Sequence, residues 1–458
     1  MIPSIPPDFE GLRKNFHSTQ DASLRQFFAH TPDELLSCWP DQLGHDVLDE
    51  LLQPELHPIP FFFILRSRLD LGKGKLDFKK IIAHAEKFCA SVNQNQLEII
   101  SPTISPSLTS FVSHLIDWAS LADQLQACLV PIYNLIKTYA PLHVITPLHP
   151  QLIKISLHCR SIEKAVEISN HDILDIDQEK CPIKYQDHLI YHYLAGTVQA
   201  LNKNYSRAIH LLTIAVSAPG PSISQFQIDA YKKLILISLL VDSTPPVLPR
   251  YTHSQFRPTF RNLVDCSPYC DFMNLYESVL AGCDDYMNLQ KSIEENLSNF
   301  QKDNNLGLIR LCMQSIPKKT ILKLTAIYSS IPVGHIQSLL KSSTLESTLE
   351  LLQSMIDKGE LRAQIDPSTN VLRFIEGDDA DLDRDQAALQ RTIERVQVFE
   401  EMISKACGEI ERDREYLKRL TNDAKTVSSF PEIFHGEKNV TGILEEDLAV
   451  DLGMAWDD

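Results

Sequence analysis

Apolar residues recur at intervals of three and four along most of this chain, and that spacing places them on one face of an α-helix. Phe111, Leu115 and Trp118 form one such set. Proline-rich stretches separate the periodic segments and act as helix breaks. The pattern predicts helices over residues 32–38, 46–52, 60–69, 78–91, 106–119, 121–140, 150–159, 161–169 and 185–201.

Residues 188–218 have the spacing of a tetratricopeptide repeat. Gly196 is followed twelve residues later by Ala208, and Ala215 comes seven residues after that. Small residues at these offsets let two antiparallel helices approach closely, with residues 202–206 as the connecting turn. Gln199 stands where an aromatic residue is usual, and any two-helix hairpin would fit these residues, but the spacing favours a repeat. One clear unit among diverged neighbours predicts an α-solenoid.

Residues 300–375 have the element order of a winged helix. A helical run over 300–316 is followed by a short linking segment, by helices near 333–341 and 345–358, and by alternating strands over 361–365 and 371–375. The strands flank Asp366-Pro367-Ser368-Thr369-Asn370, whose proline and asparagine supply turn chemistry. This hairpin is the one convincing β signal in an otherwise helical sequence.

A long helix is predicted from residue 378 to about residue 420, after an acidic start that suits the positive end of the helix dipole. Its apolar residues recur every seven positions, so they form one seam along the helix. The seam consists of Leu389, Val396, Ile403, Ile410 and Leu417, with Phe399, Ala406 and Leu420 beside them and Thr392 and Asp413 as polar interruptions. One helix cannot bury such a seam alone, so we expect it to lie along its own solenoid or to join helices of other chains.

Composition fits this mainly α-helical fold class: an α-solenoid of TPR-like helical pairs, a winged helix and a long C-terminal helix. Only 15 of the 458 residues are glycine, as is usual for a helical protein. A chain of 458 residues is too long for one ordinary hydrophobic core. The predicted domains are residues 1–187 (N-terminal helical repeats), 188–299 (TPR-like helices), 300–377 (winged helix), 378–420 (long helix) and 421–458 (an acidic tail whose composition predicts disorder).

The net charge of −17 disfavours phosphate-driven binding of nucleic acid by the chain as a whole. No apolar run approaches the roughly 20 residues of a membrane span. The first residues lack the basic and apolar regions of a signal peptide, so we expect the ten cysteines to be reduced thiols in an intracellular protein.

No catalytic, cofactor-binding or metal site is predicted. Residues 72–75 contain two glycines but lack the spacing of a phosphate loop, and are interpreted as a turn. Cys266, Cys270 and Cys283 could form a metal site with His253 on paper, but cysteine on a helix is usually buried core. Asp381, Asp383 and Asp385 resemble the start of a calcium loop, yet the required glycine and closing acid are Gln386 and Thr392. His143 and His149 lie among prolines with no evident partner.

The third helix of the predicted winged helix is acidic, although winged helices often place this helix in the major groove of DNA. It carries Glu346, Glu350 and Asp357 against Lys358. Such a face repels phosphate, and no arginine is placed to recognise guanine. Lys318, Lys319 and Lys323 precede it and are interpreted as an ordinary solvated surface.

Helical pairs that lead into a winged helix and then a long helix resemble the PCI-domain family. Its members are non-catalytic subunits of the proteasome lid, the COP9 signalosome and the translation initiation factor three complex. The sequence is similar to a COP9 signalosome member over roughly residues 185–375. The runs that carry the resemblance are IYHYLAGTVQALNKNYSRAIHLLTIAVSAP (190–219), DAYKKLILISLL (229–240), YTHSQFRP (251–258), FQKDNNLGLIRLCMQSIPKKTILKLTAIYSSIP (300–332) and ELRAQIDPSTNVLRF in the wing.

This resemblance implies a scaffold subunit, present in cytoplasm and nucleus, of the complex that removes the ubiquitin-like protein Nedd8 from cullins. The family's winged helices line up edge to edge, and its C-terminal helices form a bundle. The implied partners are other PCI and MPN-domain subunits and, indirectly, cullin-RING ligases. The implied interface residues are Leu361, Ala363, Ile365, Val371, Arg373 and Phe374 at the wing edge, and Leu389, Val396, Phe399, Ile403, Ile410, Leu417 and Leu420 in the helix seam.

Three alternatives remain open at this stage. The first is a PCI subunit of the proteasome lid or of the initiation factor. The second is a winged-helix nucleic-acid binder, which the acidic third helix disfavours. The third is an enzyme, although the sequence contains no catalytic motif that supports this. The metalloprotease subunit of the implied complex carries a His-x-His motif, and this chain lacks one.

Overall fold

A computed structural model describes residues 46–50, 52–71, 78–100, 107–141, 143–174, 176–283, 285–340, 344–366, 369–375, 380–414 and 416–418. The side chains of residues 50, 380–388 and 391 are not part of that description. The helix predicted over 32–38, the loop at 72–75 and the acidic tail over 421–458 lie outside the described residues.

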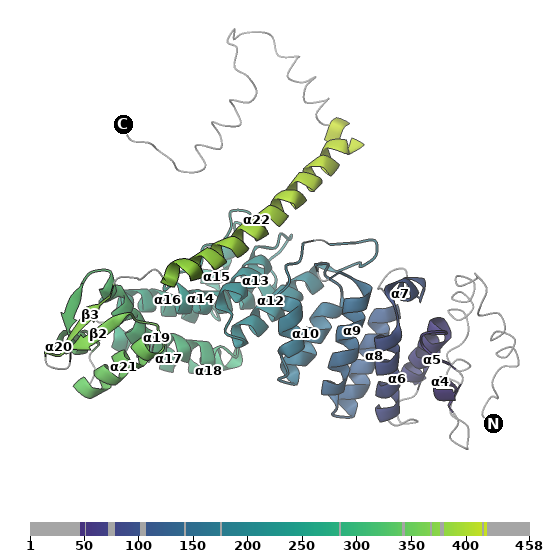
Figure 1. The fold of residues 1–458 in the computed structure, drawn as a ribbon, viewed down its shortest axis with the longest axis horizontal. Coiled ribbons are helices and arrows are strands. Elements are labelled where there is room, and N and C mark those ends of the chain that lie inside the picture. The colour runs from purple at the N-terminus through teal and green to yellow at the C-terminus, as the bar shows by residue number, and fades with distance from the viewer. Residues whose placement is uncertain are drawn as a thin grey trace, which may run out of the picture. The chain divides into compact units, whose positions relative to one another are not determined.

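The chain divides into two compact units. Helices in the first unit are α4 (Val47–Glu50), α5 (Pro58–Leu71), α6 (Phe78–Ser91), α7 (Gln94–Ile100), α8 (Ser107–Leu121), the short 3₁₀ helix η1 (Leu125–Cys128), α9 (Leu129–Tyr139), α10 (Leu148–His158), α11 (Glu163–Ser169), α12 (Tyr185–Leu201), α13 (Tyr205–Ser217), α14 (Gln225–Val241), α15 (Phe256–Asn262), α16 (Ser267–Leu280), α17 (Tyr286–Glu295), α18 (Leu297–Lys302), α19 (Leu306–Thr325) and α20 (Val333–Leu340) (Figure 1).

The second unit contains a small sheet and a long helix, α22 (Ala380–Arg412). Its strands are β1 (Ser330–Pro332), β2 (Ala363–Asp366) and β3 (Val371–Phe374). Helix α21 (Leu345–Asp357) begins in the first unit and ends in the second. The order α19, β1, α20, α21, β2, β3 is that of a winged helix, so the predicted fold class is confirmed.

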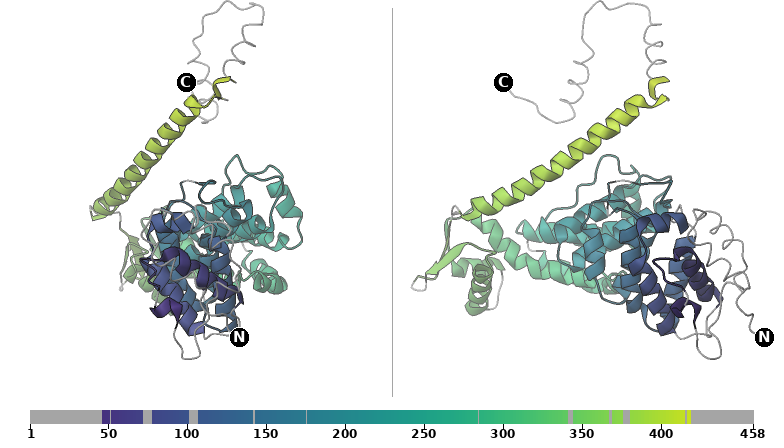
Figure 2. Two further views of the ribbon diagram at one scale, coloured as in Figure 1. Left: turned by 90° about the vertical axis from the view of Figure 1, so that its right-hand side faces the viewer. Right: turned by 45° about the vertical axis from the view of Figure 1, so that its right-hand side comes forward.

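The first unit is built from helices packed side by side, as Figures 1 and 2 show for α6, α8, α9 and α10. Its buried apolar residues form two clusters. One runs from Val47 to Leu211 and the other from Ala208 to Ile316. Helix α13 contributes to both clusters, because Leu211 belongs to the first and Ala208 and Leu212 to the second. Each helical pair therefore buries its apolar faces against its neighbours, as in a solenoid.

The close approach predicted for the TPR-like pair is confirmed between α12 and α13. A Cβ atom added to Gly196 would lie 2.7 Å from Cγ of Leu212. Ala208 and Ala215 on α13 are fully buried. Gln199 is also buried, and its Nε2 donates to Ser169 Oγ at 2.7 Å. An amide stands where the repeat usually has an aromatic ring because it ties α12 to the end of α11.

A buried polar network joins α14, α16 and the turn between α18 and α19. The Lys232 ammonium donates to Asp303 Oδ2 at 2.8 Å, and the hydroxyl of Tyr269 donates to the same oxygen at 2.9 Å. Nδ2 of Asn305 donates to the Tyr269 oxygen at 2.8 Å. Asp303 and Asn305 of this turn thus have a structural role, which is to hold the start of α19 against α14 and α16.

The helical run predicted over 300–316 is divided between two helices, since α18 ends at Lys302 and α19 begins at Leu306. Helix α19 then continues past Pro317 to Thr325, whereas the sequence predicted an end near Ile316. Burial of Ile321 and Leu324 explains the continuation, because these side chains extend the apolar face beyond the proline. The lysines in this extension are not an ordinary solvated surface. Lys323 Nζ donates to the carbonyl oxygen of Leu280 at 3.2 Å, and Lys319 donates to that of Leu239. Both therefore satisfy carbonyls in the last turns of α16 and α14.

Three further features differ from what the sequence indicated. Strand β1 was not predicted, since three residues that end in proline show no alternation. His149 has a partner after all, because its Nδ1 accepts the backbone N–H of Thr146 at 3.0 Å. The long helix is shorter than predicted, since α22 ends at Arg412 and Asp413 interrupts the helical geometry before residues 414 and 416–418.

The close contact at Gly196 predicts opposite effects for two glycine-to-alanine changes. Gly196→Ala forces Leu212 to move and should lower the free energy of unfolding by about 1–3 kcal/mol. Gly307→Ala in α19 meets nothing within 4 Å and should raise it by about 0.5–1 kcal/mol, because alanine loses less backbone entropy. Urea denaturation of both variants measures the difference. Equal effects would contradict the close packing of α12 on α13.

The buried His149 predicts acid sensitivity. Burial lowers the pKa of His149 to about 4, and the ring is neutral in the folded protein at pH 7. Between about pH 6.5 and pH 4 the unfolded chain binds a proton that the folded chain does not. The free energy of unfolding should therefore fall on acidification, by up to about 1.4 kcal/mol per pH unit for this residue.

Urea unfolding of the wild type and of His149→Gln between pH 7 and pH 5 tests this expectation. The variant keeps an acceptor for the Thr146 N–H but has no titrating group. Its stability should depend on pH less steeply, by about one proton. Identical pH dependence in the two proteins would show that His149 is not the buried neutral group responsible.

Candidate assembly interface

The three strands form an antiparallel sheet in the order β1–β3–β2. Arg362 accepts the N–H of Ile375 at 3.0 Å, so this is a hydrogen-bonded pair of the β2–β3 ladder. Because such pairs alternate along an antiparallel ladder, Gln364 with Arg373 and Asp366 with Val371 are the next ones. The backbone N–H and C=O groups of Ala363 and Ile365 therefore point away from β3.

The same alternation assigns the β1–β3 ladder. Ser329 accepts the N–H of Phe374 at 2.9 Å, and Asn370 accepts that of Val333 at 2.9 Å. Ile331 with Leu372 is consequently the hydrogen-bonded pair between them. Ser330 and Pro332 point their backbone groups away from β3.

Strand β3 is the central strand, which changes the interpretation of the predicted wing edge. Val371 and Arg373 use their backbone groups on β2, and Phe374 uses its own on β1. We expected both strands of the hairpin to pair with neighbouring chains, and the backbone of β3 is taken on both sides. An interface role for Val371, Arg373 and Phe374 remains a prediction that can act only through their side chains.

The two outer strands are not equivalent. Among the described residues no strand pairs with the outer side of β2, where Ala363 and Ile365 each present an N–H and a C=O group. The outer side of β1 presents Pro332, which has no N–H to donate. The side chains of Leu361 and Ala363 are buried, at 3% and 6% exposure, so β2 is held firmly in place. The open edge for strand addition is β2.

The second candidate surface is the apolar seam of α22. Six of the predicted seam residues are exposed to solvent: Leu389 (60%), Val396 (58%), Phe399 (39%), Ile403 (63%), Ile410 (52%) and Leu417 (47%). Leu420 lies outside the described residues. Ile393, at 41% exposure, belongs with this seam because it stands four residues after Leu389 and three before Val396. That i+4 spacing was visible in the sequence but falls outside the seven-residue repeat.

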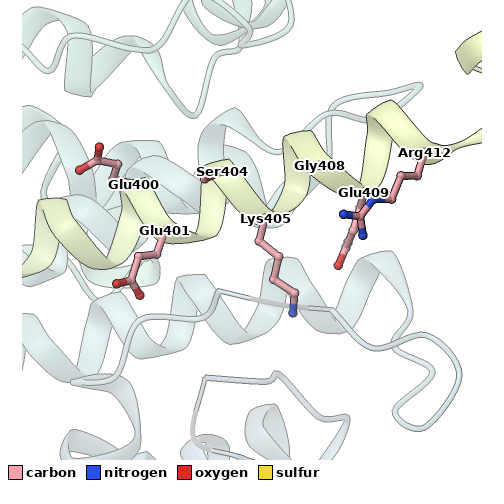
Figure 3. Close-up of a pocket in the computed structure, with 7 residues that line it drawn as sticks. All are labelled: Glu400, Glu401, Ser404, Lys405, Gly408, Glu409 and Arg412. Atoms are coloured by element: carbon pink, nitrogen blue, oxygen red, sulfur yellow. The ribbon is translucent and has the colours of Figure 1, made fainter.

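Charged side chains occupy the opposite face of α22. Figure 3 shows Glu401, Lys405 and Glu409 projecting from the same side of the helix. A residue advances about 100° around a helix, which places Lys405 roughly 180° from Val396. Together with Glu400, Ser404, Gly408 and Arg412, these residues line a shallow surface hollow made by this one helix. The helix is therefore amphipathic, with the seam as its unpartnered apolar face.

The acidic face predicted for α21 is exposed. Glu346, Glu350 and Asp357 are accessible, while Leu352 and Met355 on the other side of the helix are fully buried. Because the residues in the position of a DNA-reading face are acidic, electrostatics oppose contact with phosphates. The structure thus gives this helix a packing role.

Of the three cysteines considered as metal ligands, Cys266 is buried, Cys270 is partly buried and Cys283 is exposed. Burial raises the pKa of the Cys266 thiol to about 11 and also raises the pKa of Cys270, so both are neutral thiols at pH 7. Cys283 and His253 are exposed. This set is not brought together as a group of ligands within the described part of the chain.

Sequence reasoning missed one group with the right atoms for a metal, formed by Asp46, Asp49 and His84. The guanidinium of Arg68 already donates to both carboxylate oxygens of Asp46, at 2.9 and 2.7 Å. Nε2 of His84 lies 3.1 Å from Asp49. Burial alone would raise the pKa of Asp46, but the hydrogen bonds from Arg68 hold it below its ordinary value. The group is a buried ion pair with a neighbouring histidine. Aspartate and histidine are residue types that suggest such a group, but His84 is too far from Asp46 and Asp49 in the sequence for their proximity to be predicted.

No helix in the described ranges is long and apolar enough to cross a membrane.

Comparison with known proteins gives two matching family models. One is described as COP9 signalosome complex subunit 3, N-terminal helical repeats, and matches residues 19–256. The other is the PCI domain, which matches residues 292–376. The first covers the helical repeats and the second covers the segment from α17 to β3.

Two curated proteins are similar to the chain over most of its length. COP9 signalosome complex subunit 3 of Dictyostelium discoideum is 24% identical over 372 residues, which cover 81% of this chain and 86% of that protein. COP9 signalosome complex subunit 3 of Arabidopsis thaliana is 26% identical over 325 residues, which cover 70% of each.

Proposed function

We propose that this chain, which belongs to the family of COP9 signalosome complex subunit 3, is a non-catalytic scaffold subunit of that complex. Its work would be to hold other subunits in position while the complex removes Nedd8 from cullins. Partners would be the other PCI and MPN-domain subunits and, through them, cullin-RING ligases in cytoplasm and nucleus. Family membership supports this reading over a subunit of the proteasome lid or of the initiation factor.

The observation that carries the proposal is the open edge of β2. An edge strand with free backbone groups can accept a strand from another chain, and the hydrogen bonds so formed supply affinity. Ala363 and Ile365 offer these groups to a partner, and their side chains point to the apolar side of the sheet. A neighbouring subunit's winged helix would extend the sheet at this edge.

The seam of α22 would provide a second attachment. Its exposed apolar residues are spaced to pack as knobs between other helices, and packing them would remove them from water. Burying apolar surface contributes roughly 25 cal/mol per Å², so several large side chains along one helix are a substantial driving force. The charged face would remain in water at the outside of a multi-chain bundle.

The edge predicts a specific effect for a proline at Ala363. Proline removes the outward N–H of residue 363 and leaves the β2–β3 ladder intact, because that ladder uses Arg362, Gln364 and Asp366. Ala363→Pro should reduce co-purification of the partner subunits by at least about tenfold, while the helical circular dichroism stays unchanged.

Ala363→Val is the matched control for this experiment. Valine is close to proline in size but keeps the N–H, so both variants place a similar extra volume at a position that is 6% exposed. Valine should retain the partners if the backbone edge is the binding group. Equal retention by proline and valine variants, or equal loss in both, would contradict strand addition at β2.

The seam predicts a position-dependent effect of one substitution on α22. Val396→Asp places a carboxylate within the seam, where assembly would bury it without a partner. Val398→Asp introduces the same change two residues away, on the charged side, at 49% exposure compared with 58%. Val396→Asp, alone or with Ile403→Asp, should lower the yield of the full complex by at least about tenfold, and Val398→Asp should not.

Quantitative mass spectrometry of complexes purified from cells measures this difference. Because both valines are exposed in the isolated chain, neither substitution should alter its fold. A full complex with the Val396→Asp, Ile403→Asp variant would rule out the seam as an attachment surface.

A further inference from the structure

A cavity of about 220 Å³ lies between α14 and the turn that joins α18 to α19. Three lysines line it, Lys232, Lys233 and Lys302, together with the carboxylates of Asp229 and Asp303. The formal charge of these groups is three positive less two negative, which leaves one positive charge. None of these residues belongs to the candidate assembly surfaces.

Part of this charge is already neutralised. Lys232 Nζ lies 2.8 Å from Asp303 Oδ2 and 3.8 Å from Asp229 Oδ1, and its side chain is 3% exposed. Asp303 also accepts the Tyr269 hydroxyl. The hydrogen bond between Lys232 and Asp303 fixes α14 to the turn, and Asp229 is a more distant carboxylate that is 32% exposed.

Lys233 is different, because no carboxylate of the described residues contacts its ammonium group directly, although Asp229 and Asp303 lie near enough to favour its charged form. The residue is 7% exposed, and its Nζ donates to the neutral Oδ1 of Asn305 at 2.6 Å. Its other contact is with the ring of Tyr193, whose centroid is 6.0 Å away. Among the described residues no acidic oxygen lies within 4.0 Å of this nitrogen. A nearly buried ammonium whose only hydrogen-bond partner is neutral is costly, and two of its three N–H groups remain available.

Other donors at the cavity are also available. Lys302 is exposed and forms no ion pair with any described residue, and the side-chain amide of Asn304 has no hydrogen-bond partner within the same set. Asn305 is the N-cap residue of α19, a helix of 20 residues whose N-terminal end carries partial positive charge. Lys233 on α14, and Lys302 and Asn304 at the turn between α18 and α19, therefore bring hydrogen-bond donors without a full set of acceptors to this cavity.

We propose that this cavity binds the phosphate group of a small soluble phosphate compound. Lys233 and Lys302 would donate to the phosphate oxygens, and Asn304 would supply a neutral donor. Phosphate fits better than a carboxylate, because it has more acceptor oxygens and two negative charges at neutral pH. The ligand would neutralise Lys233 and would strengthen the link between α14 and the start of α19.

Isothermal titration of the full-length chain with inorganic phosphate and pyrophosphate, at constant ionic strength set with sodium chloride, tests the site. Saturable binding by the wild type is expected, with an affinity at least about tenfold weaker in Lys233→Met and in Lys302→Met. Lys154→Met, which alters an exposed lysine on α10, is the matched control and should bind as the wild type does.

Acetate in place of phosphate separates the two oxyanion chemistries. Acetate that binds as tightly as phosphate would overturn the assignment of a phosphate group. Absence of saturable phosphate binding, or equal binding by Lys302→Met and the wild type, would overturn the site itself. Lys302 is exposed and outside the buried network, so its variant gives a decision even if Lys233→Met folds poorly.

Discussion

A β-strand can form backbone hydrogen bonds on two sides, and β3 has both sides taken. Its residues alternate between β1 and β2, so each strand on its flank has one paired side and one outer side. This constraint decides where the sheet can grow. The outer side of β2 carries two complete backbone pairs, at Ala363 and Ile365, and the outer side of β1 lacks a donor at Pro332.

The helices also differ in whether their apolar faces are buried by other helices or exposed to solvent. In the first unit, the buried apolar residues of the helices form two clusters, and both clusters include residues of α13. In the second unit, α22 carries an apolar seam that is exposed along its described length. Among the described residues, the sheet edge and the seam are the two surfaces whose pairing groups or regularly spaced apolar side chains remain open. Both incomplete surfaces follow the repeats along the chain, which is where a scaffold subunit would meet its neighbours.

The features that the sequence predicted well depend on local chemistry. The small size and the spacing of Gly196 and Ala208 predict a closely packed helix pair, and the composition of residues 366–370 predicts a turn. The order of helices before the hairpin followed from periodicity. These features need no knowledge of which segments meet in space.

The features that were missed depend on contacts between distant segments. Strand β1 has three residues, and only its pairing with β3 makes it a strand. Pro317 predicts a helix end, and burial of Ile321 and Leu324 overrides that local preference. Lys319 and Lys323 resemble a solvated surface until the ends of α14 and α16 are placed beside them. Lys233 has an aspartate four residues before it, so the sequence does not reveal that its ammonium donates to the neutral amide of Asn305 and not to a carboxylate.

The unequal edges of the sheet give the chain a direction. A partner strand that adds to β2 finds a donor and an acceptor at each outward residue, whereas one that adds to β1 meets Pro332 and loses a hydrogen bond there. Sheet extension is therefore favoured on the side of β2, because the outer side of β1 offers the N–H of Ser330 but no donor at Pro332. A subunit with one extendable edge and one apolar helix can position two different partners without competition between them, because backbone pairing and seam packing use separate surfaces of the same unit.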